Sequence, residues 1–269
     1  MSRIAEAFAR LRRQGKRGFI PFITAGDPDL ETTRALLVEL ARAGATLVEL
    51  GVPFSDPVAD GPVIQRASER ALRHPTGVKE ILRAVSEAQK ETYVPVVLFS
   101  YYNPLLSFGL ERLSREARDA SVDGVLVTDL APEEAEEFNA ALRAQELDMI
   151  FLVAPTSSDA RLSMVAERAS GFIYAVSRAG VTGARERMSA DAERLVGRVR
   201  HFSGLPVAVG FGISTAEQVA EVWRYADAAV VGSAIVEEIE RLAGAPDIVT
   251  TVGDFARRLL PQGSLNVRD

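Results

Sequence analysis

Short apolar runs alternate with amphipathic segments along almost the whole chain. The runs are rich in Val, Ile, Leu and Phe and have the length of buried strands. The segments between them, such as ETTRALLVELARAG and PEEAEEFNAALRAQ, repeat apolar residues at helical spacing. Strands of this kind alternating with helices indicate a parallel sheet covered by helices. The pattern predicts strands at 18–23, 46–50, 94–99, 123–127, 149–153, 171–176, 205–209 and 227–231.

Eight such units in a chain of 269 residues match the size of a (β/α)8 barrel. The interval before the third run is longer than the others and holds helical segments at 61–73 and 77–90, which predicts an extra helix. An open, doubly wound sheet is the competing architecture, but no glycine-rich dinucleotide fingerprint follows the first run. We expect a single domain over 1–269, with a flexible tail at 261–269.

The first residues, SRIAEAFARLRRQGKR, are amphipathic and rich in arginine, as some organelle transit peptides are. Ile4, Phe8 and Leu11 fall on one helical stripe, and the segment joins the first strand directly. These features favour a helix docked on the domain over a targeting segment.

Composition narrows the classes of function. The formal net charge of −6 argues against a nucleic-acid groove or an anionic membrane as the main partner. A local site for a small anion remains compatible with it. The absence of cysteine excludes disulfides, thiolate nucleophiles and cysteine-based metal sites. No apolar stretch approaches the roughly 20 residues of a membrane span, and we expect a cytoplasmic protein.

Two carboxylates stand out in TLVELGVPFSDPVADGP, residues 46–62. Strand alternation places Leu47 and Glu49 on one face, and in a barrel a glutamate near the strand's carboxyl end is poorly solvated. Its pKa should therefore be raised, whereas Asp60 on the following loop should stay ionised, and two such carboxyls can divide acid and anion roles. The alternative is structural: Glu49 pairs with an arginine and Asp60 caps the next helix.

Glycines follow the last two predicted strands, in GFGIS (210–214) and VGSAI (231–235). Glycines let backbone N–H groups approach an anion, and these loops often bind phosphate in barrels. We expect Gly212, Gly232 and Ser233 to donate hydrogen bonds there. Plain turn formation is the alternative, since Ser214 and Glu217 also form a capping-box pattern.

The segment SRAGVTGARERMSA (177–190) has small residues and the composition of a mobile lid, or of a plain connector. Tyr174 fits either barrel packing or a hydroxyl aimed at a substrate. His74 and His201 follow helical runs and should lie at the amino-terminal side of the barrel, so no histidine triad or metal site is expected. These residues alone support a phosphate-binding barrel enzyme with carboxylate acid/base chemistry, a sugar-phosphate isomerase included.

Several blocks resemble the alpha subunit of tryptophan synthase, in order and spacing, over nearly the whole chain. They are PFITAGDP (21–28), ELGVPFSDPVADGPVIQ (49–65), YYNP (101–104), SRAGVTG (177–183), GFGIS and VGSAI. The resemblance implies a lyase that cleaves indole-3-glycerol phosphate to indole and D-glyceraldehyde 3-phosphate by a retro-aldol step. It implies that Glu49 is the acid/base group and that Asp60 accepts the indole N–H.

The resemblance also implies the remaining site residues. Gly183, Gly212, Gly232 and Ser233 would hold the phosphate, and Thr182 would meet Asp60 when the lid closes. The surroundings of the indole would be formed by Phe22, Tyr101, Tyr174 and Phe211.

The family works as an alpha2beta2 heterotetramer, in which the beta subunit carries pyridoxal phosphate and the alpha chain has no cofactor. The resemblance places the partner contact at 53–58 (PFSDPV) and at Asn103 and Pro104. Two alternatives remain open. One is a free-standing lyase that releases indole, and the other is a non-catalytic subunit that only activates the beta partner.

Overall fold

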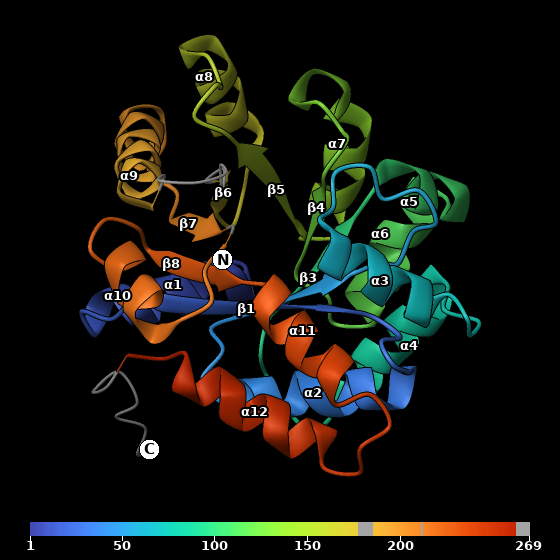
Figure 1. Cartoon of the computed structure of the whole chain (residues 1–269). Coiled ribbons are helices and arrows are strands. Elements are labelled where there is room, and N and C mark those ends of the chain that lie inside the picture. Colours follow the sequence, from blue (N-terminus) through green and yellow to red (C-terminus); the bar gives the residue numbers. More distant parts are fainter. Residues whose placement is uncertain (177–184, 211, 262–269) are drawn as a thin grey trace.

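A computed structural model describes residues 1–176, 185–210 and 212–261. Eight parallel strands follow each other around a closed barrel, and β8 pairs with β1 (Figure 1). The barrel prediction is confirmed, and the open, doubly wound alternative is wrong. Every observed strand overlaps its predicted run, with ends shifted by up to two residues. The strands are β1 Gly18–Thr24, β2 Val48–Gly51, β3 Val96–Ser100, β4 Gly124–Val127, β5 Asp148–Val153, β6 Ile173–Val176, β7 Val207–Gly210 and β8 Ala228–Val231.

Helices surround the barrel on its outside (Figure 1). No helix in the described ranges is both long enough and apolar enough to cross a membrane. The α-helices are α1 Arg3–Arg13, α2 Leu30–Arg42, α3 Pro62–Ala71, α4 Val78–Ala88, α5 Tyr102–Phe108, α6 Leu110–Asp119, α7 Glu136–Ala144, α8 Asp159–Arg168, α9 Arg185–Phe202, α10 Ala216–Val222, α11 Ser233–Arg241 and α12 Ile248–Arg258, and η1 Pro132–Glu134 is a 3-10 helix.

Three units carry an extra helix, those that follow β2, β3 and β8, and in the last of them α11 is followed by α12. The predicted segments 61–73 and 77–90 are α3 and α4, and Pro62 occupies the first turn of α3. A second extra helix, α5, follows β3 and was not predicted. The segment PEEAEEFNAALRAQ is not one helix, because its first three residues form η1 and α7 begins only at Glu136.

The strands separate two apolar layers. Val48 and Leu50 of β2 face outward into the larger core beneath the helices, whereas Leu47 belongs to the cluster inside the barrel. Alternation therefore puts Glu49, two residues after Leu47, on the inner face as predicted. The inner cluster fills the barrel with side chains from the strands, so the barrel is a packed core with no open pore.

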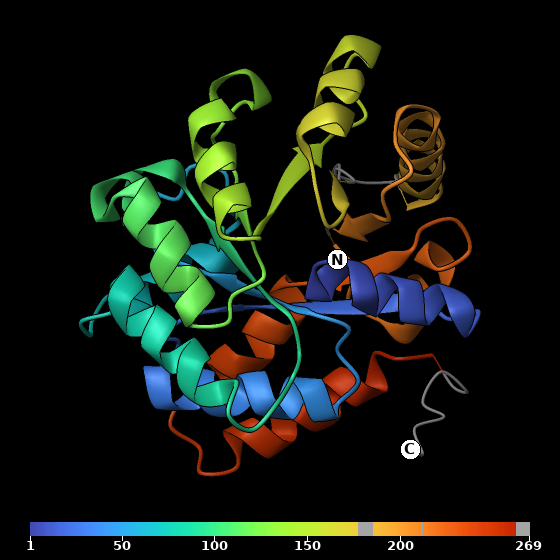
Figure 2. The ribbon, with the colours of Figure 1, turned by 180° about the vertical axis from the view of Figure 1, so that it is seen from behind.

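Helix α1 closes the amino-terminal end of the barrel, where it lies across the front of Figure 2. Ile4 and Phe8 are buried in the inner cluster, and the Phe8 ring lies 5.8 Å from that of Phe172. This confirms the docked helix.

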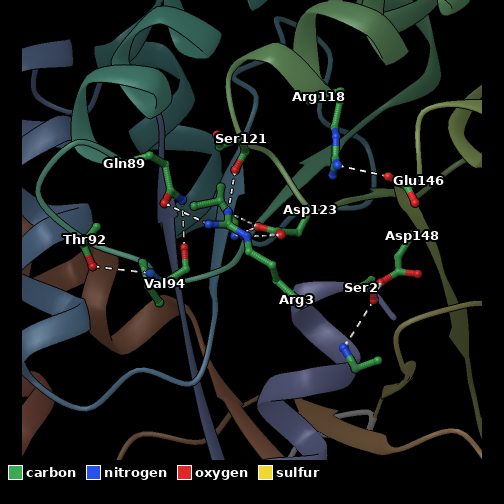
Figure 3. A network of polar contacts seen from close by, with 12 residues as sticks. Ser2, Arg3, Gln89, Thr92, Val94, Arg118, Ser121, Asp123, Glu146 and Asp148 are labelled. Carbon is green, nitrogen blue, oxygen red and sulfur yellow. Dashed lines mark hydrogen bonds and ion pairs between the residues drawn. The ribbon is translucent and has the colours of Figure 1, made fainter.

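Polar contacts fix the start of α1. The Arg3 guanidinium binds both carboxylate oxygens of Asp123 at 2.6 and 2.7 Å and the Ser121 carbonyl at 2.8 Å (Figure 3). The Ser2 hydroxyl donates to Asp148 at 2.5 Å. Because this end is closed, the chemistry belongs at the carboxyl ends of the strands.

Candidate active site

Glu49 lies inside the barrel near the carboxyl end of β2, beside Phe22 of β1 and Val97 of β3 in the strand register. Its side chain is 1% exposed, and its Oε1 has no hydrogen-bond partner among the described residues. Burial raises the pKa of this carboxyl well above its usual range. The structural alternative for Glu49 fails, since the described residues place no arginine in an ion pair with it.

Asp60 ends the loop that leads from β2 to α3. The backbone fixes its position: its N–H donates to the Pro57 carbonyl at 3.0 Å, and its carbonyl accepts from Gln65 Nε2 at 2.9 Å. Burial raises the pKa of the Asp60 carboxyl to about 6, against a lowering by a hydrogen bond from Tyr101. Asp60 does not cap α3, because Gly61 is the N-cap residue and no side chain bonds there. Its carboxyl is thus ionised above about pH 6.

Tyr101, the N-cap residue of α5, supports the loop that carries Asp60. Its hydroxyl accepts from the Ala59 N–H at 2.9 Å, and the Phe54 ring packs 5.2 Å away. Burial and the neighbouring Asp60 charge raise the pKa of this phenol to about 12, so it remains a hydrogen-bond donor at neutral pH.

Both carboxylates line one cavity of about 280 Å³ at the carboxyl ends of the strands. This volume is close to the lower end of small-ligand pockets, about 300 Å³. Phe22 and Phe99 meet edge to face in its wall, with ring centroids 5.4 Å apart. Its remaining walls are formed by Ala59, Gly61, Ile64, Tyr174, Gly212, Val230, Gly232 and Ser233.

Tyr174 has the barrel-packing position that the sequence left open, and it also reaches the cavity. It packs in the inner cluster at 5% exposure and also lines the cavity. Its pKa is raised by burial and by the nearby Glu49 charge. A Cβ atom on Gly210 would lie 2.1 Å from the Tyr174 hydroxyl, so the glycine makes room for the ring.

The predicted phosphate residues Gly212, Gly232 and Ser233 lie together on the cavity wall. Ser233 begins α11, whose first turn has N–H groups without intrahelical partners. The N-terminus of α11 therefore presents backbone donors and a partial positive charge to the cavity. Gly212 has a φ of +73°, a conformation that favours glycine.

The capping-box prediction was wrong by one residue. Helix α10 begins at Ala216, which makes Thr215 the N-cap and Gln218 the third helical residue. The Thr215 hydroxyl accepts from the Gln218 N–H at 3.3 Å, and the Gln218 side chain accepts from the Thr215 N–H at 3.2 Å. The segment STAEQ contains both patterns, and the start of the helix decides between them.

Three predicted residues, Thr182, Gly183 and Phe211, lie outside the described residues, as does the tail from 262 onward. His74 and His201 are exposed and line neither this cavity nor another described one. Within the described ranges, no three His, Cys, Asp or Glu side chains are arranged to hold a metal ion.

Sequence reasoning missed two features. Phe99 and Ile64 line the cavity. Strand alternation could have identified Phe99, because it lies on the same strand face as Val97, but nothing in the sequence pointed to Ile64. A buried ion pair also connects the two helices that border the site. Arg70 of α3 binds both oxygens of the 1% exposed Asp27 at 2.8 Å and Glu240 of α11 at 2.7 Å.

The chain resembles one family in sequence and in structure. The family model for the tryptophan synthase alpha chain matches residues 8–258. A tryptophan synthase alpha chain of Geobacter sp. (strain M21) is 51% identical over 259 residues, 96% of this chain and 97% of the relative. That of Dechloromonas aromatica (strain RCB) is 54% identical over 243 residues, 90% of each chain.

The solved structures give the same result. The crystal structure of tryptophan synthase subunit alpha from Legionella pneumophila superposes with a TM-score of 0.89 at 36% identity, covering 96% of this chain and 97% of that one. An aminoacrylate-bound form of tryptophan synthase from M. tuberculosis superposes at 0.85 with 36% identity, covering 96% and 100%.

Proposed function

The chain belongs to the tryptophan synthase alpha chain family, whose members are lyases that cleave indole-3-glycerol phosphate, and we propose that Glu49 and Asp60 perform this cleavage. The products are indole and D-glyceraldehyde 3-phosphate. One observation carries the assignment: Glu49, a buried carboxyl with an oxygen that has no partner among the described residues, shares a cavity with the carboxyl of Asp60.

Glu49 acts as the acid and then as the base. Burial raises its pKa, which favours the protonated carboxyl that can deliver a proton to C3 of the indole ring, a poor base. The resulting carboxylate accepts the proton of the side-chain hydroxyl. As the C–C bond to C3 breaks, the hydroxyl-bearing carbon becomes the aldehyde carbon, and the electron pair of the broken bond returns to the ring. The proton count balances without a further reactant.

Asp60 stabilises the charge that this step creates. Protonation at C3 makes the ring cationic, and its N–H becomes a stronger hydrogen-bond donor. A carboxylate that accepts this N–H lowers the barrier where the charge appears. The pKa of about 6 keeps Asp60 ionised at neutral pH.

The phosphate binds at the other side of the cavity. No lysine or arginine lines the described cavity, so the backbone donors of Gly212, Gly232 and Ser233 and the α11 dipole hold the anion. Phe22 and Tyr174 flank the indole. Thr182, Gly183 and Phe211 remain assignments from the resemblance, and Tyr101 acts on Asp60 through a hydrogen bond.

The family relation implies a beta-subunit partner, and we place its contact at 53–58 with Asn103 and Pro104. Val58 is 79% exposed and Leu106 is 51% exposed, so apolar side chains are available there. The loop 53–58 leads directly into Asp60, so a partner that presses on it would act on the catalytic carboxylate. An alpha2beta2 assembly, with pyridoxal phosphate on the beta subunit and no cofactor on this chain, completes the proposal.

The decisive experiment measures indole release from indole-3-glycerol phosphate by the purified chain, alone and with a tryptophan synthase beta subunit. We expect slow release alone and a large increase with the partner, because the partner contacts the loop of Asp60.

Each alternative has its own outcome in this experiment. Fast release that the partner does not change would favour the free-standing lyase. Substrate binding without any release in either condition would leave a non-catalytic activating subunit, and the cleavage proposal would be wrong.

A further inference from the structure

A second cavity adjoins the substrate cavity and shares Phe22, Asp60, Ile64 and Phe99 with it. Its volume of about 10 Å³ is close to the space that a single water molecule requires. Polar side chains from four elements line it: Thr24, Asp60, Ser68, Ser100 and Tyr101. A cavity this small and this polar suits a bound water, which normally makes about three hydrogen bonds.

Thr24 provides the second observation. It ends β1 two residues after Phe22, so its side chain lies on the inner face. The side chain is 2% exposed, and Oγ1 has no hydrogen-bond partner among the described residues. A buried hydroxyl without a partner is costly, and in native proteins such groups commonly bind ordered water.

We propose that Thr24 is a positioning residue for Asp60, acting through one water held in this small cavity. The water accepts a hydrogen bond from Thr24 Oγ1 and donates one to the Asp60 carboxylate. Its second proton goes to Ser100 Oγ, which donates its own proton to the Tyr101 carbonyl at 2.8 Å and has lone pairs available. The inference extends the proposed function, since it names a further residue that prepares Asp60 for the indole N–H.

Burial raises the pKa of Asp60, and hydrogen bonds from the water and from Tyr101 would both lower it. A hydrogen bond to the charged form of a carboxyl lowers its pKa. The other titratable groups near Asp60 are Glu49 of β2 and Tyr174 of β6 across the substrate cavity, and Asp129 beyond Tyr101. Neither of these two adjoining cavities has a cation among its described lining residues. Hydrogen-bond donors therefore keep Asp60 ionised, and the water that Thr24 holds is one of them.

The test compares Thr24→Val, which keeps the side-chain shape and removes the hydroxyl, with Thr24→Ser, which keeps the hydroxyl. The readout is the pKa of the Asp60 carboxyl in the substrate-free protein, followed by carboxyl 13C NMR and assigned by its loss in Asp60→Asn. We expect Thr24→Val to raise this pKa by roughly one unit, the size of one hydrogen bond to a charged group. Thr24→Ser should restore it.

Thr46→Val is the matched control. Thr46 is also buried, but it lies at the amino-terminal end of β2 and its hydroxyl accepts from the Phe19 N–H at 3.1 Å. Its replacement should lower stability and leave the Asp60 pKa unchanged, which separates general destabilisation from the effect of the water.

A second readout uses turnover with the beta partner. The acid limb of kcat/KM against pH should move upward in Thr24→Val by the same amount as the Asp60 pKa, and remain in place in Thr24→Ser.

Two results would overturn the inference: equal Asp60 pKa values in the wild type and Thr24→Val, or a high-resolution crystal structure without a water between Thr24 and Asp60. The NMR titration needs no substrate. A shifted pKa in a protein that does not release indole would refute the proposed cleavage and leave the water in place, so the two failures can be told apart.

Discussion

The two ends of the barrel both bury carboxylates, but they surround them differently. At the amino-terminal end Asp123 accepts two hydrogen bonds from Arg3 and another from the Val96 N–H, at 2.8 Å. At the carboxyl end Glu49 has an oxygen with no partner in the described residues. Burying an unpaired polar oxygen is costly, whereas a paired carboxylate contributes to the fold.

This difference distinguishes the structural carboxylates from the proposed catalytic acid better than burial does. Asp148 shares the closed end, and burial raises its pKa, but hydrogen bonds from Ser2 and Ser170 oppose the shift. Asp27 lies near the open end and is paired with Arg70. Glu49 Oε1 has no such compensation among the described residues, which supports the proposed role of this carboxyl as the acid.

Replacing Glu49 should have the largest effect. This effect should be a loss of activity without a loss of stability. Glu49→Gln removes the proton that is delivered to C3, so we expect indole release to fall about 10³-fold, within the range of general acid/base groups. Stability at pH 8 should not decrease, because the variant keeps the side-chain shape and removes a buried carboxyl whose Oε1 has no partner among the described residues. Initial rates with the beta partner and urea unfolding measure the two quantities on the same preparations.

A rate within about tenfold of wild type would show that Glu49 is not the acid. A large loss of stability together with the rate would instead make Glu49 structural, and the contrast between the two ends would disappear.

The opposite result is expected at the closed end. Arg3→Met keeps the aliphatic stem and removes the guanidinium, which leaves the 7% exposed Asp123 without its ion pair. The cost should be about 2 kcal/mol of unfolding free energy, below the range for a fully buried pair because Arg3 is partly exposed. Turnover per folded molecule should stay at the wild-type level. Arg12→Met, a replacement of the same type on α1, is the control and should change stability little.

The sequence predicted the barrel well because its signals are local. Alternation put Glu49 inside the barrel, and the stripe of Ile4 and Phe8 identified the docked helix. The glycines at 212 and 232 predicted two loops that could bind phosphate, and the structure brings both glycines to one cavity. Each of these features follows from residues close together in the sequence, so a local pattern is enough to predict it.

The missed features depend on residues far apart in the chain. Arg70 meets Asp27 and Glu240 only after α3 and α11 pack together, and no spacing announces that contact. The pKa of Asp60 is the clearest case. Its loop position suggested ordinary ionisation, but burial raises its pKa to about 6, although a hydrogen bond from Tyr101 opposes the shift. Burial by distant segments is the part that one sequence does not show.

The burial of Asp60 leads to the smallest expected effect, a change in stability that depends on pH. The pKa of Asp60 is raised from 3.8 to about 6, so between these values the folded protein binds more protons than the unfolded chain. Stability must then fall as pH rises through this window, and Asp60→Asn removes the fall. Below about pH 4 the variant and wild type should be equally stable. Above about pH 6 the variant should gain on the order of 1 kcal/mol of unfolding free energy, since solvent at this half-buried site screens the full shift.

Urea unfolding at pH 3.8, 5 and 7.5 measures the difference in stability between Asp60→Asn and the wild type. An equal gain at all pH values would mean that the Asp60 carboxyl is not desolvated in the fold, and its contrast with the well-paired Asp123 would then rest on geometry alone.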